Sequence, residues 1–473
     1  MKQGWLVIVV TLILLGCTDA PVSSPSATEP VTTNPALAPF IKVYPASAAA
    51  IINAGNNFST GDIITPKLSA APGFKFAALS SGESELGEVT LNSADPIIIH
   101  MAHDSQEVRI VATNTELRQA VNESVVSGNR IILLQPGNYD LPETVFVRET
   151  ANNLTLRSLS TNYRDTAITG NAYNNMFLVR GDYFTLEGLT LGGTSHSERK
   201  FVRNHIVQLQ GEKDADYLTL RDNRFIDSFE QMIKVSTSSD RTKSGDYGLV
   251  ENNLFEFTDG KAPQWYTGGI DAHNANHWVV RGNTFRHIHI NHLADTRLTE
   301  GAIHFWSNSR DTLIENNIIY NVDRGIMLGL TSSSGHNGAI VRNNMIMTNN
   351  DVGIYLASAT NVDVYNNSIW LNSNYANAIE YRFDGSQNNL IVNNLTNAQV
   401  RSRNGGQATV INNVTNAQAD WFVDWQSGDL HLAQQPESVI KRGQYVEGLN
   451  QDIDGQQRPI DGIDIGADQV QIN

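Results

Sequence analysis

The sequence predicts an all-β protein that folds as a right-handed parallel β-helix, a solenoid in which successive turns of the chain stack as rungs. A motif of the form apolar-x-apolar-x-x-Asn-x-apolar recurs through the middle of the chain. Its copies follow one another at intervals of about 27 residues, which is typical of a solenoid repeat. The segments alternate as short β-strands do and lack helical spacing. One elongated solenoid therefore accounts for most of the 473 residues.

The chain opens with a segment typical of exported proteins. Lys2 precedes an apolar run over residues 5–15, which is too short to span a hydrocarbon core of ~30 Å and is expected to be a signal peptide. Residues 14–17, Leu-Leu-Gly-Cys, resemble the bacterial lipoprotein box. This resemblance implies lipidation of Cys17, and Thr18 after it implies the outer membrane of the bacterial envelope. The alternative is an ordinary secretory signal with a chance cysteine.

The rest of the chain divides by composition and pattern. The expected segments are a signal peptide (1–17), a Ser/Thr/Pro-rich tether (18–40), a β-rich segment without an assignable pattern (41–108), the β-helix (109–415) and a C-terminal cap (416–473). A helix over residues 113–126 is predicted to cap the first rung, because Leu117, Ala120, Val121 and Val125 share one face.

The repeated asparagine is predicted to form a ladder within the solenoid. The copies place it at Asn223, Asn253, Asn283, Asn317, Asn344, Asn367, Asn394 and Asn413. Two upstream copies carry Leu159 and Leu189 instead. Stacked rungs lie ~4.8 Å apart, so each amide can bond its neighbours and avoid the cost of being buried alone. We interpret this ladder as scaffold.

A second strand precedes each strand that leads into an asparagine. Its rungs are Ile233–Val235, Ile270–His273, Ile303–Trp306, Ile326–Leu328, Ile354–Leu356 and Ile379–Arg382. Alternation sends the isoleucines inward and the residues between them outward. One outward column is therefore Lys234, Asp271, His304, Met327, Tyr355 and Glu380, and the next column contains His273, Trp306 and Arg382. So many titratable and aromatic side chains predict a glycan-binding groove rather than a merely decorated surface.

The groove contains the groups that a polysaccharide lyase needs. Such an enzyme removes the proton α to a uronate carboxylate, neutralises that carboxylate and protonates the leaving oxygen. The predicted catalytic residues are His304 or Lys234 as base, Tyr355 as acid, Lys234 or Arg382 as neutralising cation, and Asp271 to orient the base. The predicted substrate-binding residues are His273, Trp306, Glu380, Trp265 and Tyr266.

Two other functions remain open. A glycosidase needs two carboxyl groups roughly 5–10 Å apart. Asp271 and Glu380 are four rungs, about 19 Å, apart, so the second carboxylate would have to be Asp295 or Glu300 on a loop. An epimerase could use the same groove. A non-catalytic adhesion protein would use Trp306 to bind a glycan without cleaving it.

Cofactors are not encoded by a specific motif. His287, His289 and His292 lie close in sequence, but their spacing matches no defined metal site, and solvated loop histidines are the preferred interpretation. A divalent cation such as calcium remains open, because aspartate and asparagine are abundant and a cation would neutralise a uronate.

Composition excludes several classes of protein. The net charge of −16 argues against a nucleic-acid partner, since phosphate binding needs a basic surface. The same charge disfavours a polyanionic substrate unless the groove is locally positive. Cys17 is the single cysteine, which excludes disulfide scaffolds and Cys-ligated zinc. The expected partners are a polysaccharide and, through lipidated Cys17, a membrane; a monomer is expected.

From about Val111 to its end the chain resembles right-handed β-helix proteins of the carbohydrate-active group, including chondroitinase B-like and alginate lyases. Residues 266–273 (Tyr-Thr-Gly-Gly-Ile-Asp-Ala-His), residues 302–306 (Ala-Ile-His-Phe-Trp) and the C-terminal Asp464-Ile-Gly-Ala-Asp468 carry this resemblance. It implies a pectin lyase-like fold and action on glycans. Lys234 matches the lysine of chondroitinase B-like enzymes, but Asp271 stands where their arginine would follow.

Overall fold

The computed structural model describes residues 34–54, 57–141, 143–170, 174–193 and 204–471. The chain forms two compact units, one from the residues up to Ile110 with Val446–Gly448, the other from Val111–Tyr445 with Leu449–Asn473. The predicted signal peptide and Cys17 lie outside the described residues. No helix in the described ranges is both long and apolar enough to traverse a bilayer.

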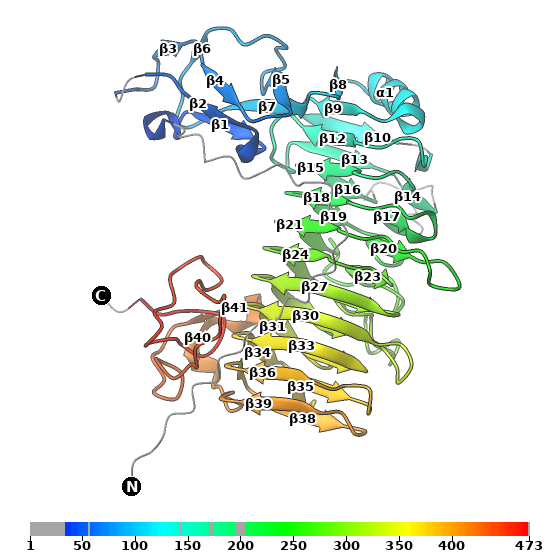
Figure 1. The fold of residues 1–473 in the computed structure, drawn as a ribbon, viewed down its shortest axis with the longest axis vertical. Helices are drawn as coiled ribbons and strands as arrows, with labels where there is room; N and C mark the ends of the chain where they lie inside the picture. Colours follow the sequence, from blue (N-terminus) through cyan, green and yellow to red (C-terminus); the bar gives the residue numbers. More distant parts are fainter. Residues whose placement is uncertain (1–33, 55–56, 142, 171–173, 194–203, 472–473) are drawn as a thin grey trace, which may run out of the picture. The chain divides into compact units, whose positions relative to one another are not determined.

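The second unit is a parallel β-helix with three strands in each rung (Figure 1). Its first long sheet runs from β10 (Gly137–Asp140) to β37 (Leu395–Thr396), and its second from β9 (Arg130–Leu134) to β39 (Ala408–Ile411). The third sheet consists of β11 (Val145–Val147), β14 (Asn175–Val179), β17 (His205–Gln210), β20 (Ile233–Ser236), β23 (Ile270–His273), β26 (Ile303–Trp306), β29 (Ile326–Leu328), β32 (Ile354–Ala357), β35 (Asn377–Arg382) and β38 (Gln399–Arg403). Every third strand pairs in parallel, which confirms the predicted fold.

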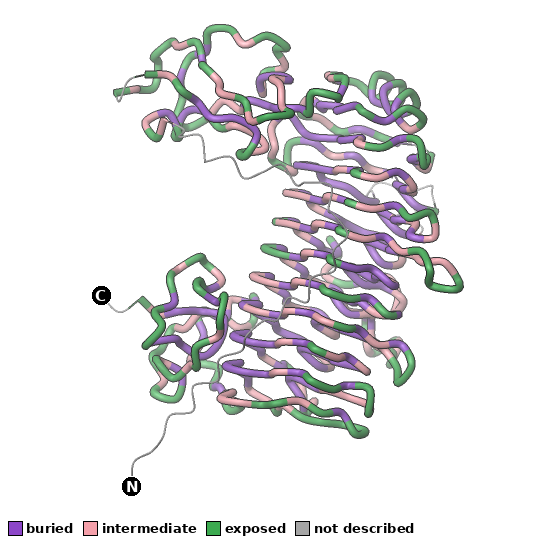
Figure 2. The backbone as a smooth tube through the Cα atoms, viewed as in Figure 1, coloured by how far each residue is buried: buried purple, intermediate pink, exposed green. Residues whose placement is uncertain are grey.

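Apolar side chains fill the interior of the solenoid. Phe225, Phe255 and Phe285 are fully buried and stack on successive rungs, with ring centroids 4.8 and 4.4 Å apart. Figure 2 shows buried residues along the strands and exposed residues at the turns. This stacking of like residues follows from the repeat, because equivalent positions lie one strand spacing apart.

The asparagine ladder is confirmed from Asn223 to Asn413. Each side-chain amide donates to the Oδ1 of the asparagine on the next rung, as Asn283 does to Asn317 at 3.0 Å. The same Oδ1 accepts the backbone N–H of Asn283 at 3.0 Å. Leu189 begins the series, and its backbone N–H donates to Asn223.

Different elements pack on the first rung and on one side of the solenoid. Helix α1 (Asn114–Ser127) begins at a capping box formed by Thr113 and Glu116, as expected from a helix at this position. The hairpin of β40 (Phe422–Asp424) and β41 (Asp429–Leu432) belongs to an apolar cluster that includes Met345 and Leu395. The C-terminal segment therefore packs on the outer face of the first long sheet.

The N-terminal unit has its own apolar core. Its central sheet orders β1 (Ile41–Tyr44), β7 (Ile97–His103) and β5 (Phe74–Leu79). Ile41, Ile99 and Met101 are buried within it. Residues 41–108, which show no repeat pattern, thus belong to a small β-rich unit.

A row of aspartates follows one corner of the solenoid. The Oδ1 of Asp182 accepts the N–H of Asp216, and the Oδ1 of Asp216 accepts the N–H of Asp246. Burial and the charges of Asp246 and Asp182 raise the pKa of Asp216 to about 6. The next rung carries Asn276, whose amide donates to Asp246 at 2.8 Å.

Asp216→Asn is expected to stabilise the protein at pH 8 and to leave its stability nearly unchanged at pH 4. A carboxyl whose pKa is higher in the folded state than in the unfolded state weakens folding as the pH rises through the window from about 4 to about 6. The asparagine of the variant does not titrate in this window. Its side-chain amide can donate to Asp182, as the Asn276 amide donates to Asp246. Melting temperatures of both proteins across this pH range measure the effect, and equal gains at pH 4 and pH 8 would contradict it.

Candidate active site

The predicted outward column is observed in the third sheet. Lys234 pairs with Asp271, Asp271 with His304, His304 with Met327, Met327 with Tyr355, and Tyr355 with Glu380. The intervening residues face the core, as shown by fully buried Ile270 and Phe305. Although the column faces outward, its members are buried by one another and by flanking loops, with Asp271 at 3% exposure.

Asp271 is the centre of the first group of polar side chains, which we call the Lys234 cluster: His205, Glu230, Lys234, Asp271, His273, Glu300, His304 and Trp306. The Lys234 ammonium donates to Asp271 Oδ2 and contacts His273 Nε2 at 2.8 Å. The Trp306 indole donates to Asp271 Oδ1 at 2.7 Å. Burial alone would raise the pKa of Asp271, but the interaction with His273 and the charge of Lys234 hold it well below its usual range. Asp271 is therefore a buried, ionised anchor.

His273 has the most exposed histidine side chain of the cluster. An ammonium can only donate, so Lys234 directs its proton at the Nε2 lone pair of a neutral His273. The side chain of His273 is 24% exposed, against 1% for His304. Its Nε2 also lies 3.4 Å from Asp271 Oδ2, close enough to stabilise an imidazolium.

His304 lies beside Asp271, and its side chain is almost fully buried. Its ring stacks on Trp306 with centroids 5.4 Å apart, and its Nε2 donates to the carbonyl of Gly329 at 3.3 Å. Its Nδ1 lies 3.8 Å from Asp271 and 3.6 Å from Glu300. Asp271 Oδ1 and Glu300 Oε2 can therefore be no more than about 7.4 Å apart, which is the sum of those two distances.

Two further members of the cluster were not predicted from the sequence. His205 is buried and lies 3.5 Å from Glu230. Burial, with a contribution from the charge of Lys234, lowers the pKa of His205 to about 4, so it is neutral at pH 7. Burial raises the pKa of Glu230. The carboxylate comes from the turn before β20, where no repeat pattern marks it.

The structure does not bring Tyr355, Glu380 and Arg382 to the Lys234 cluster. Tyr355 lies four rungs from Lys234, about 19 Å along the sheet, because stacked strands advance by a fixed distance. These three residues line a separate pocket of about 360 Å³, which we call the Arg382 pocket. Tyr375 and Arg403, which the sequence did not identify, also line it.

Trp265 and Tyr266 lie on the loop before β23. Their rings are 5.6 Å apart, and the guanidinium of Arg297 lies 4.8 Å from the Trp265 ring. Trp265 also packs against the core of the solenoid. The Thr267 carbonyl accepts the N–H of Glu300, which ties this loop to the one that carries Glu300.

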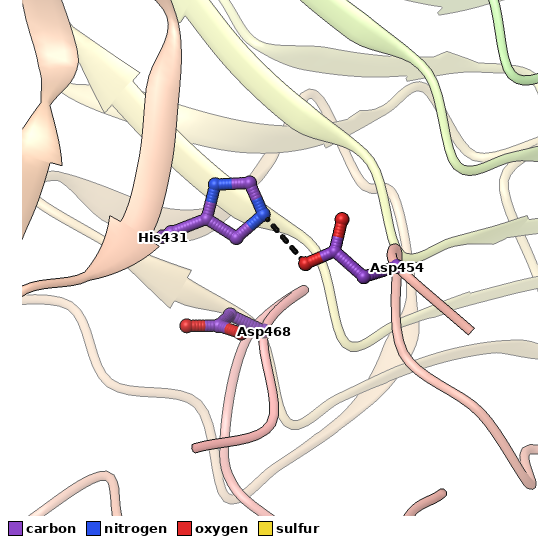
Figure 3. A group of neighbouring side chains, drawn as sticks. All are labelled: His431, Asp454 and Asp468. Atoms are coloured by element: carbon purple, nitrogen blue, oxygen red, sulfur yellow. Dashed lines mark ion pairs between the residues drawn. The ribbon is translucent and has the colours of Figure 1, made fainter. Parts of the chain in front are cut away.

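The clustered histidines do not converge on a metal site. His287 contacts Asn321, and His292 pairs with Asp323 at 2.8 Å. Within the described ranges, one group has the spacing of metal ligands: His431, Asp454 and Asp468, whose ligand atoms lie within 4.8 Å of one another (Figure 3). His431 is paired with Asp454 at 3.0 Å and with Asp429 at 2.6 Å, and this network joins β41 to the C-terminal turns.

Comparisons with known proteins identify the solenoid. The family described as a right handed beta helix region matches residues 204–396. No curated protein sequence matches the chain. The chain therefore contains a right-handed β-helix.

Solved structures with a similar fold include enzymes and an adhesin. The pectate lyase Pel9A is 15% identical, with 78% of this chain and 97% of that chain covered at a TM-score of 0.47. The Streptococcus pneumoniae surface protein and adhesin PfbA is 11% identical, with 64% and 93% covered at a TM-score of 0.40. The alginate lyase from Paenibacillus sp. str. FPU-7 is 12% identical, with 65% and 99% covered at a TM-score of 0.36.

Proposed function

We propose that the protein is a polysaccharide lyase that cleaves a uronate-containing glycan by β-elimination at the Lys234 cluster. The observation that carries this proposal is the contact between Lys234 and His273, which places a cation beside an accessible neutral imidazole. Elimination requires this combination, because the cation stabilises the charge that develops on the carboxylate while the base removes the neighbouring proton.

The proposed reaction uses His273 twice. An incoming uronate carboxylate accepts from Lys234, which frees His273 Nε2. The imidazole removes the proton at C5, the C4=C5 double bond forms as the C4–O4 bond breaks, and the resulting imidazolium protonates the departing oxygen. Asp271, 3.4 Å from His273 Nε2, stabilises the imidazolium. Trp306 offers an aromatic surface to the sugar ring.

His273→Gln is expected to lower kcat by about 10²- to 10⁴-fold, the usual contribution of a positioned general base. The substrate screen uses polygalacturonate, alginate and glucuronate-containing polysaccharides, and the readout is the ultraviolet absorbance of unsaturated chain ends. His277→Gln is the matched control, because its half-exposed ring stacks on Tyr247 outside the cluster. Cleavage that yields only saturated ends, or full activity in His273→Gln, would refute the proposal.

A hydrolase is the second candidate, favoured by the proximity of Asp271 and Glu300. Their separation of at most about 7.4 Å falls within the range in which two carboxyl groups cleave a glycosidic bond. Asp271 is held ionised by its partners, so Glu300 would be the acid. If the protein is a hydrolase, the wild type releases reducing ends and forms no unsaturated product. Glu300→Gln would then abolish this release.

Export and lipid anchoring at Cys17 belong to the same proposal. A lipid at this position would hold the enzyme at the bacterial outer membrane. Labelling of cells with a fatty acid, followed by capture of the wild-type protein and of Cys17→Ser, tests the anchor. Equal labelling of both proteins would exclude it.

A further inference from the structure

The Arg382 pocket lies on the same face of the solenoid as the Lys234 cluster but on later rungs. It is lined by residues of β29, β32, β35 and β38 and by loops between them. Arg382 is on β35, three rungs beyond Trp306 and four beyond His273. The two sites are therefore about 14–19 Å apart along the sheet.

The floor of the pocket is apolar. Met327, Val352 and Tyr355 form an apolar cluster on the outside of the solenoid, and Leu330 and Tyr375 pack against it. Such a cluster on an outward face is not needed to fill the core. It places apolar side chains at the base of the pocket, and such groups suit the C–H face of a pyranose ring.

Most of the charges in the pocket neutralise one another. Arg324 pairs with Asp351 at 3.0 Å. Arg403 pairs with buried Glu380 at 3.1 Å, and Tyr375 donates to the same carboxylate at 2.6 Å. These two ion pairs leave the wall of the pocket electrically balanced.

Arg382 is the exception. Its Nε donates to Asn404 at 2.8 Å and its Nη1 to the Tyr355 hydroxyl at 3.5 Å, both neutral partners. Within the described part of the chain, no carboxylate lies within ion-pair distance of it. Because Tyr355 accepts from Arg382, the proton of its own hydroxyl is free to donate. The pocket thus presents one unneutralised guanidinium and a hydroxyl donor above an apolar floor.

We propose that the Arg382 pocket is a subsite for a uronate residue, in which Arg382 and Tyr355 bind the sugar carboxylate. This inference rests on the proposed function, since it places a second part of the same glycan chain. Each sugar of an extended chain advances by about one rung, so the bound uronate lies about three or four sugars from the cleaved bond. A planar guanidinium suits the two oxygens of a carboxylate, and it makes the pocket locally positive in an otherwise acidic protein.

Calorimetric titration of the His273→Gln protein tests the subsite without turnover. The probes are hexamers of galacturonate, mannuronate and glucuronate, with a neutral glucose hexamer for comparison. Arg382→Gln is expected to weaken binding of the preferred uronate hexamer by about 10- to 100-fold. Tyr355→Phe should weaken it less, and neither change should alter binding of the neutral hexamer. Arg148→Gln, which removes the same charge from an exposed side chain after β11, is the matched control.

The outcomes separate this inference from the proposed function. Unsaturated products from the wild type, with unchanged hexamer affinity in Arg382→Gln, would overturn the subsite and leave the lyase standing. Hexamer binding that depends on Arg382, with no elimination by the wild type, would support the subsite and refute the lyase. Equal losses in Arg382→Gln and Arg148→Gln would show only a general charge effect and would also overturn the subsite.

Discussion

Asp271→Asn is expected to lower the free energy of unfolding by about 3–5 kcal/mol and to abolish turnover. The change removes the charge of a buried carboxylate and leaves the Lys234 ammonium, itself 9% exposed, without its anionic partner. An uncompensated buried charge costs about this much, because the protein interior cannot replace the lost hydration. Urea unfolding followed by circular dichroism measures the first effect, and unsaturated product formation the second.

A double variant separates the role of the charge from that of packing. Lys234→Met combined with Asp271→Leu removes both charges, and replacing a buried ion pair with apolar side chains is often neutral for stability. We expect the double variant to recover most of the stability that Asp271→Asn loses while remaining inactive. If Asp271→Asn is as stable as the wild type, the carboxylate is not the anchor of the Lys234 cluster.

The outward column was predictable because it depends only on the backbone. Alternation along each strand and the parallel register place Lys234, Asp271 and His304 on neighbouring rungs. The division of the column into two sites follows from the same strand spacing and could also have been predicted. The sequence grouped Tyr355 with Lys234, whereas the fixed strand spacing separates them by four rungs.

The residues that sequence reasoning missed lie where the repeat gives no signal. Glu230 comes from a turn, and Arg403 belongs to β38, whose sequence Gln-Val-Arg-Ser-Arg lacks the apolar alternation of earlier rungs. Glu300 was identified only as a loop carboxylate, and its approach to His304 follows from loop conformation. Both histidines face outward, but their exposure could not be read from the repeat: the side chain of His273 is 24% exposed and that of His304 is 1% exposed.

Asn317→Ala is expected to lower the free energy of unfolding by about 3–6 kcal/mol. Asn317 is fully buried, and its Oδ1 accepts from both the backbone and the side chain of Asn283. Its Nδ2 donates to the carbonyl of Val280 and to Asn344. Alanine leaves several of these groups unsatisfied, and each such buried group costs about 1–3 kcal/mol.

Asn413, at the end of the ladder, is the matched control for the loss of stability expected in Asn317→Ala. Asn413 lies on the last rung and is half-buried, so water can replace its partners when it is changed to alanine. We expect Asn413→Ala to cost about 1 kcal/mol or less. Each rung contacts mainly its neighbours, so hydrogen exchange in Asn317→Ala should accelerate first in the strands around residues 283 and 344. Equal losses for the two variants would contradict this expectation, because burial would then make no difference to the cost of breaking the ladder.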